Sequence, residues 1–95
     1  MSAKTFSRAV TITNRHGLHA RPAVTIVKTV RKYDAQTTIR KGNQTVDAAS
    51  VLDLLSLGAT QGAELLLSAK GRQAQEVIEA LAQLFAAEFE VDYKD

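Results

Sequence analysis

Residues 17–23 read Gly17-Leu18-His19-Ala20-Arg21-Pro22-Ala23, and this stretch indicates where the first helix of the chain begins. Apolar residues recur at helical spacing after it, and most basic residues fall between them. Pro22 would break a helix interior but is tolerated in the first turn, where backbone N–H groups have no intrahelical partner. The pattern predicts an amphipathic helix over residues 20–33 that begins immediately after His19. Its apolar face is expected to comprise Ala20, Ala23, Val24, Val27 and Val30.

The segments on either side of this helix predict one sheet and two further helices. Residues 5–13 are rich in β-branched residues and read as a strand, although Arg8 interrupts the alternation at its exposed start. Gly42-Asn43 is a hairpin signal between strands at 36–41 and 44–47. A short apolar helix at 50–57, a strand at 63–69 and a long amphipathic helix at 74–85 follow. The order βαββαβα predicts an α+β fold with the helices on one face of the sheet and water on the other.

Size and composition limit the kinds of protein this chain can be. With 95 residues it is expected to form a single domain, 1–95, with 92–95 as a loose tail, and it has little room for a deep substrate cleft. Cysteine is absent, which excludes disulfides and thiolate chemistry. The longest apolar run, residues 84–87, is far shorter than the ~20 residues of a membrane span. The N-terminus lacks the apolar stretch of a signal peptide, so we expect a cytoplasmic protein.

Charge is distributed unevenly along the chain. The first 41 residues carry nine basic residues and one acidic residue, whereas the remainder carries three basic and nine acidic residues. A basic half attracts phosphate groups, an acidic protein face or nucleic acid, unless most of these charges are simply solvated. With five aromatic residues, no recognisable motif and an acidic second half, nucleic-acid binding is disfavoured.

His19 is the candidate reactive residue. A helix start binds anions through unpaired N–H groups and roughly half a positive charge, and here the backbone donors would be those of Ala20 and Arg21. The Arg21 guanidinium can grip phosphate oxygens in a bidentate manner. Imidazole is a competent nucleophile near neutral pH, and a phosphorylated ring nitrogen gives up its phosphate readily. Spacing alone does not separate this role from that of an ordinary histidine at a helix N-terminus.

The quoted heptapeptide resembles the active-site signature of the histidine-containing phosphocarrier proteins, the HPr family of the phosphoenolpyruvate-dependent sugar phosphotransferase system. The similarity extends from residue 5 to about residue 89. It continues through Lys32-Tyr33-Asp34-Ala35, Ser50-Val51-Leu52, Ser56-Leu57-Gly58-Ala59 and Gly62-Ala63-Glu64. The resemblance implies an open-faced β-sandwich in which four antiparallel strands, in the order 1-4-2-3, lie beneath three helices.

The resemblance also implies a function. His19 would accept phosphate on Nδ1 from a phosphohistidine of Enzyme I and donate it to a histidine on the IIA domain of a sugar permease, with Arg21 stabilising the phosphate. The chain would then be a carrier and not an enzyme, would need no cofactor and would be a monomer. The alternative is a regulatory carrier in a nitrogen-type or incomplete phosphotransferase relay that controls transcription or enzymes.

Ser50 stands where many family members carry a serine that a dedicated ATP-dependent HPr serine kinase phosphorylates, which lowers carrier activity and can recruit a transcriptional regulator. Ala49 and Asp53 depart from the usual lysine and glycine of that neighbourhood. The alternative role of Ser50 is a helix N-cap, because an acid three residues later resembles a capping box. Asp53 would also repel a new phosphate.

Family members dock on Enzyme I and IIA through this short helix and the start of the first one. By position, the docking surface would comprise Ala20, Arg21, Val24, Val51, Leu52, Leu55 and Ser56. His16 lies three residues before His19, but two histidines without a nearby carboxylate or thiolate make a poor ligand set, so no metal site is predicted.

Overall fold

The computed structural model describes residues 4–90 of the chain. Its elements follow in the order β1 (Thr5–Thr11), α1 (Ala20–Val30), β2 (Gln36–Lys41), β3 (Gln44–Asp47), α2 (Val51–Ser56), β4 (Glu64–Lys70) and α3 (Ala74–Ala86). The predicted βαββαβα order is therefore confirmed. Within these residues no helix is both long and apolar enough to cross a membrane. The tail predicted at 92–95 lies outside the described residues.

The four strands form one antiparallel sheet in the order β1-β4-β2-β3, as the family resemblance implied. Strand β4 is central because it pairs with β1 on one side and with β2 on the other. Its alternate residues Leu65, Leu67 and Ala69 are buried, whereas the strand's other residues are exposed or half-buried. This period-two pattern places the core on one face of the sheet only.

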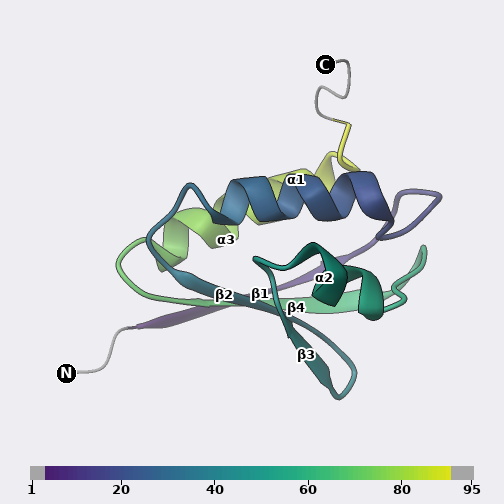
Figure 1. The fold of residues 1–95 in the computed structure, drawn as a ribbon. Helices are drawn as coiled ribbons and strands as arrows, with labels where there is room; N and C mark the ends of the chain where they lie inside the picture. Colours follow the sequence, from purple (N-terminus) through teal and green to yellow (C-terminus); the bar gives the residue numbers. More distant parts are fainter. Residues whose placement is uncertain (1–3, 91–95) are drawn as a thin grey trace.

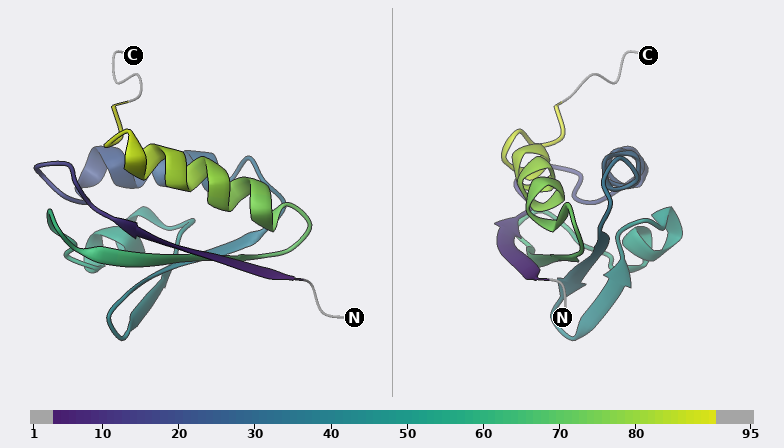
Figure 2. Two further views of the ribbon diagram at one scale, coloured as in Figure 1. Left: turned by 180° about the vertical axis from the view of Figure 1, so that it is seen from behind. Right: turned by 90° about the vertical axis from the view of Figure 1, so that its left-hand side faces the viewer.

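Helices α1 and α3 lie side by side and antiparallel over the buried face, and α2 lies beside α1 near β3 (Figures 1 and 2). The end-on view in Figure 2 shows the two layers, with the opposite face of the sheet uncovered. Because α1 and α3 run in opposite directions, the start of α1 and the end of α3 meet at one end of the molecule. The predicted α+β class and open-faced architecture are confirmed.

The buried face of α1 differs from the prediction. Pro22, Ala23, Ile26, Val27 and Val30 are buried, whereas Ala20 and Val24 are exposed. Ala20 and Val24 lie four residues apart, so they form a separate row on the helix surface beside the buried stripe. The predicted apolar face therefore divides into a buried stripe and an exposed row, and the prediction missed the buried Ile26. The helix also ends at Val30 rather than at Tyr33, with a turn over residues 31–32.

Other boundaries differ from the predictions by one or two residues. Strand β1 ends at Thr11, although Ile12 remains buried and its N–H donates to the Ala63 carbonyl at 2.9 Å. In the predicted hairpin, Gly42 has a φ of 59° and begins the two-residue connection. A positive φ at the first central position alone is the pattern of a type II′ turn, whose twist suits paired strands.

The C-terminal end of α3 closes with a Schellman motif. The Phe89 N–H donates to the Leu84 carbonyl at 2.8 Å, and the Glu88 N–H donates to the Phe85 carbonyl at 3.1 Å. Glu88 has a φ of 56° and Phe89 a φ of 58°, a region that non-glycine residues rarely occupy. Phe89 is 2% exposed and packs edge-on against Phe85, with ring centroids 4.8 Å apart, so its burial offsets part of the backbone strain.

Candidate functional site

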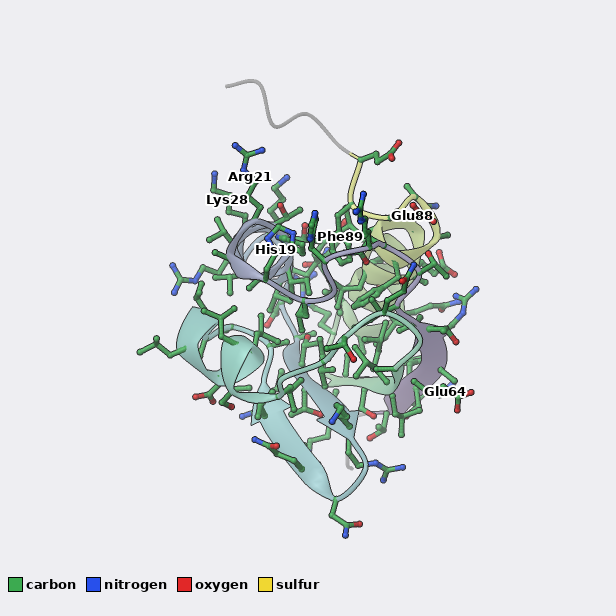
Figure 3. All side chains as sticks on the ribbon, turned by 90° about the vertical axis from the view of Figure 1, so that its right-hand side faces the viewer. His19, Arg21, Lys28, Glu64, Glu88 and Phe89 are labelled. Carbon is green, nitrogen blue, oxygen red and sulfur yellow. The ribbon has the colours of Figure 1, made fainter. Side chains whose placement is uncertain are left out.

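His19 is the N-cap of α1 and its side chain is exposed to solvent. Its backbone is extended, with φ −97° and ψ −167°, and its carbonyl accepts the first helical hydrogen bond from Ala23 at 3.1 Å. The imidazole makes no capping hydrogen bond to this helix. The helix begins directly after His19, as predicted, and the ring lies on the outer surface at that end of the molecule (Figure 3).

The two residues before His19, Gly17 and Leu18, are buried and hold it in place. Leu18 is 6% exposed, and its N–H donates to the Ala59 carbonyl at 2.9 Å. Gly17 has a φ of 65°, and a Cβ at this position would lie 2.5 Å from the Ala59 oxygen. The loop between α2 and β4 therefore supports the backbone directly beneath His19, and only glycine fits at position 17.

The start of α1 provides a positively polarised environment for the ring. The first turn of a helix has backbone N–H groups without intrahelical acceptors, and it concentrates the positive end of the helix dipole. No acidic residue lies in the first turn of α1. Ala20 is the first helical residue, and Arg21 follows with its side chain directed away from the sheet (Figure 3). An exposed imidazole at a helix start, two residues before an arginine, is suited to taking up a phosphoryl group.

The structure brings a second imidazole, that of His16, to this site; from the sequence, His16 was considered only as a metal ligand. The ring centroids of His16 and His19 lie 5.8 Å apart with an interplanar angle of 83°. The three-residue spacing of the two histidines was visible in the sequence, but the contact between their rings depends on the turn at residues 14–17. Among the described residues, no group of three or more His, Cys, Asp or Glu side chains could hold a metal ion.

The residues predicted to bind partners lie on the neighbouring helices α1 and α2. Val24 is 39% exposed, Leu52 79% and Leu55 36%, whereas Leu54 is fully buried in the core. Ala20 and Ser56 are exposed and Val51 is half-buried. We name the exposed apolar residues Val24, Leu52 and Leu55 the docking patch. Large apolar side chains exposed next to one another are typical of a protein-binding surface.

Ser50 caps α2. Its side-chain oxygen accepts a hydrogen bond from the Asp53 N–H at 3.2 Å. The reciprocal half of a capping box is missing, because an Asp53 carboxylate oxygen faces the Asp47 N–H at 3.4 Å instead. The predicted capping box is therefore only half formed. Ser50 itself is half-buried, and the carboxylates of Asp47 and Asp53 are tied to the backbone around it.

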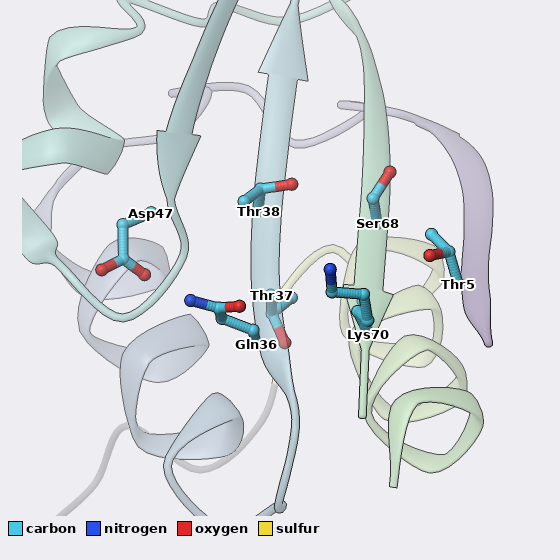
Figure 4. A pocket seen from close by; sticks show the side chains of 8 residues that line it. Thr5, Gln36, Thr37, Thr38, Asp47, Ser68 and Lys70 are labelled. Atoms are coloured by element: carbon cyan, nitrogen blue, oxygen red, sulfur yellow. The ribbon is translucent and has the colours of Figure 1, made fainter. Parts of the chain in front are cut away.

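A shallow hollow of about 380 Å³ lies elsewhere, on the uncovered face of the sheet (Figure 4). Residues of all four strands line it: Thr5, Gln36, Thr37, Thr38, Asp47, Ser68, Ala69 and Lys70. None of these residues belongs to the segment around His19.

Comparison with known proteins bears directly on this site. Residues 6–87 match the family model described as the PTS HPr component phosphorylation site. The chain belongs to the HPr family. The match covers both the loop that carries His19 and the helices beside it, and HPr proteins are phosphocarriers of the phosphotransferase system.

Individual HPr relatives agree with this assignment. The phosphocarrier protein NPr of Klebsiella oxytoca is 37% identical over 89 residues, which are 93% of this chain and 99% of that protein. The phosphocarrier protein HPr of Vibrio cholerae is 37% identical over 79 residues, which are 83% of this chain and 93% of that protein. Two solved HPr structures from Thermoanaerobacter tengcongensis are also similar. One has a TM-score of 0.87 at 38% identity, covering 92% of this chain and 98% of that one. The other, described as a dimer, has a TM-score of 0.73 at 40% identity, covering 86% and 94%.

Proposed function

We propose that His19 accepts a phosphoryl group from a phosphohistidine of Enzyme I and donates it to a histidine on the IIA domain of a sugar permease. In each step the N–P bond of the donor breaks as an N–P bond forms on the acceptor ring, and no other reactant is consumed. The carrier returns to its starting state after two steps, so it is a substrate of its partners and not an independent enzyme. The observation that carries the proposal is the exposed His19 ring at the start of α1.

Arg21 and the backbone at Ala20 and Arg21 are proposed to bind the phosphoryl oxygens. Phosphoryl transfer depends mainly on positioning and on charge neutralisation, which a helix start and a guanidinium both provide. The docking patch is proposed to seat the partner, because apolar side chains beside basic residues such as Lys28 suit an acidic protein face. We propose that the carrier works as a monomer in the cytoplasm.

A second candidate function is a nitrogen-type relay with a regulatory output. Relatives named NPr are 37% and 40% identical to this chain and relatives named HPr are 37% identical, so identity alone does not separate the two functions. The two functions differ in their partners, since the reacting histidine would be the same. Competition between a sugar-type and a nitrogen-type Enzyme I for limiting carrier separates them.

Regulation at Ser50 is a further proposal with a clear physical obstacle. A phosphate on Ser50 would displace the hydrogen bond to the Asp53 N–H and would stand beside two carboxylates. A serine kinase acting here would therefore have to weaken the cap of α2. That effect would also disturb Leu52 and Leu55, which are on the same helix.

The test is phosphorylation with Enzyme I and phosphoenolpyruvate. We expect an acid-labile, base-stable phosphate that is absent from His19→Ala and present in His16→Ala, followed by its transfer to a IIA domain. His16→Ala is the matched control because it removes the other exposed ring of the same loop. Phosphate that persists in His19→Ala would refute the assignment of the reacting residue.

A further inference from the structure

The imidazole rings of His16 and His19 lie edge to face at the start of α1, with their ring centroids 5.8 Å apart. We propose that His16 is a positioning residue whose protonated ring donates a hydrogen bond to a phosphoryl oxygen on His19. This makes the stability of the phosphorylated carrier depend on pH. The inference rests on the proposed function, since it concerns the same reacting ring, but its decisive test does not require Enzyme I.

The turn that carries His16 is held at both of its ends. The Asn14 side-chain amide donates to the Gly17 carbonyl at 2.7 Å, and the Gly17 N–H donates to the Asn14 carbonyl at 3.2 Å. Gly17 in turn packs against the backbone of Ala59 and Thr60. The backbone on either side of His16 is therefore tied down, and the ring is kept beside His19.

No acidic side chain pairs with His16 in the described structure, so a phosphoryl group on His19 would be its anionic partner. Its charged neighbours along the chain are Arg15 and Arg21, which are both basic. The loop 59–62 that packs against this turn contributes Ala59, Thr60, Gln61 and Gly62, none of which is ionisable. Over residues 4–90, the ion pair found is between Arg72 and Asp34, and no carboxylate pairs with His16. A phosphoryl group on His19 would bring negative charge next to a ring that has no acidic partner of its own.

The thermodynamic consequence follows from linkage. An opposite charge a few ångströms away favours the protonated ring, so the midpoint at which His16 titrates should rise by about one pH unit on phosphorylation. By reciprocity, protonation of His16 favours the phosphorylated state to the same extent, about tenfold in the transfer equilibrium. The shift of the transfer equilibrium toward the phosphorylated carrier is complete at pH values below the His16 midpoint of the unmodified protein. It is lost as the pH rises through the His16 midpoint of the phosphorylated protein.

Histidine suits such a role because it is the side chain whose charge ordinarily changes between pH 5 and 8. A metal bridge between the two rings is a poorer explanation, because the described residues offer no third ligand. A purely structural edge contact would hold the rings together but would not link the titration of His16 to phosphate on His19. The test therefore measures that link.

The experiment follows the ring nitrogens of His16 by NMR as a function of pH, before and after phosphorylation of His19. Phosphoramidate supplies the phosphate chemically: its P–N bond breaks, ammonia leaves and an N–P bond forms on the ring. The species modified on His19 alone is selected for measurement. We expect the His16 midpoint to rise by about one unit. The same rise in Arg15→Gln would show that the effect does not need the neighbouring guanidinium.

Three variants give the second readout, which is the equilibrium of phosphate between Enzyme I and the carrier across pH 5.5–8.5. His16→Asn keeps a hydrogen-bonding side chain without titration and should lose the His16-dependent part of the pH response. His16→Lys supplies a permanent cation and should restore the acidic-pH value at all pH values. His16→Phe keeps a ring without a donor and should behave like His16→Asn.

An unchanged His16 midpoint after phosphorylation, or a His16→Asn profile identical to that of the parent protein, would overturn the inference. Neither result would touch the carrier function if Enzyme I still charges His19. Conversely, failure of Enzyme I to charge the parent protein would count against the proposed function alone, because the chemical experiment would still decide the role of His16.

Discussion

The backbone N–H of Leu18 donates a 2.9 Å hydrogen bond to the carbonyl oxygen of Ala59. This bond joins the residue before His19 to the loop between α2 and β4, more than forty positions away in the chain. A Cβ on the neighbouring Gly17 would lie 2.5 Å from the same carbonyl oxygen. The geometry of the reactive loop is therefore a property of the whole fold, and the first prediction concerns its tightest point.

Gly17→Ala should destabilise the protein by more than the usual strain of a left-handed residue. The new Cβ would lie 2.5 Å from the Ala59 oxygen and 2.9 Å from the Thr60 Cα, and these backbone atoms cannot easily move. We expect a loss of about 3 kcal/mol in urea unfolding, against about 1 kcal/mol for Gly42→Ala. Gly42 is the matched control because it has a similar φ with open space around it. Equal losses would show that the close contact at Gly17 is unimportant.

Arg21→Glu should slow phosphoryl transfer with little change in stability, since Arg21 is exposed. A charge-assisted hydrogen bond to phosphate contributes about 1.5–3 kcal/mol, so the rate should fall about tenfold or more. Arg21→Lys keeps the charge but not the bidentate geometry, and an intermediate rate is expected. Transfer from Enzyme I, followed by rapid quench, measures this. A normal rate in Arg21→Glu would contradict the assigned role.

Leu52→Glu should impair partner binding without unfolding the protein. The side chain is 79% exposed, so the substitution leaves the core intact, but it places a negative charge in the docking patch. We expect the dissociation constant for Enzyme I to rise about tenfold, as for a residue that contributes more than 1 kcal/mol to an interface. Gln83→Glu adds the same charge on exposed α3 and should bind normally. Equal weakening by both variants would indicate a general charge effect instead of a local surface.

Ser50→Ala should remove the cap of α2 at a cost of about 1 kcal/mol in thermal or urea unfolding. Ser50→Asp should retain most of that stability, because aspartate accepts the same hydrogen bond. Comparing the phosphoryl-transfer rates of Ser50→Ala and Ser50→Asp distinguishes a capping role of Ser50 from a regulatory one. Slow transfer in Ser50→Asp with normal stability would favour control by a negative charge at this position. Normal transfer in both would leave Ser50 a structural residue.

Glu88→Gly should stabilise the protein. Glu88 occupies the C′ position of the Schellman motif with a φ of 56°, where glycine avoids the steric cost of a Cβ. We expect a gain of about 1 kcal/mol in urea unfolding. Glu90→Gly removes the same side chain two residues later, where no left-handed conformation is found, and should give no gain. A loss of stability in Glu88→Gly would mean that the carboxylate outweighs the backbone strain.

Local signals predicted much of this fold. The start of α1 could be placed at Ala20 because proline in a first turn is a short-range constraint. The hairpin at Gly42-Asn43 was equally local. The buried stripe of α1 was harder, because the apolar side chain of Val24 follows helical spacing as well as Ile26 does. Helical spacing alone does not distinguish an exposed apolar residue from one that is buried in the core.

The contact between His16 and His19 could not be predicted, because it depends on contacts between distant segments. The turn that joins them is positioned by Ala59 and Thr60, whose proximity appears only when β1 pairs with β4. The end of β1 was misjudged for the same reason. Ile12 has the composition of a strand residue, but the pairing with β4 stops at Thr11↔Glu64.

The exposure of the His19 ring has a further consequence. Under the proposed function, a phosphate on the exposed His19 ring would be open to attack by water, and because imidazole is a good leaving group it would hydrolyse unless a partner accepted it. A carrier of this kind cannot act as a reservoir. If Enzyme I charges His19 as proposed, the phosphorylated fraction of the protein would follow the supply of phosphoenolpyruvate, so the protein would report that supply as well as carry phosphate.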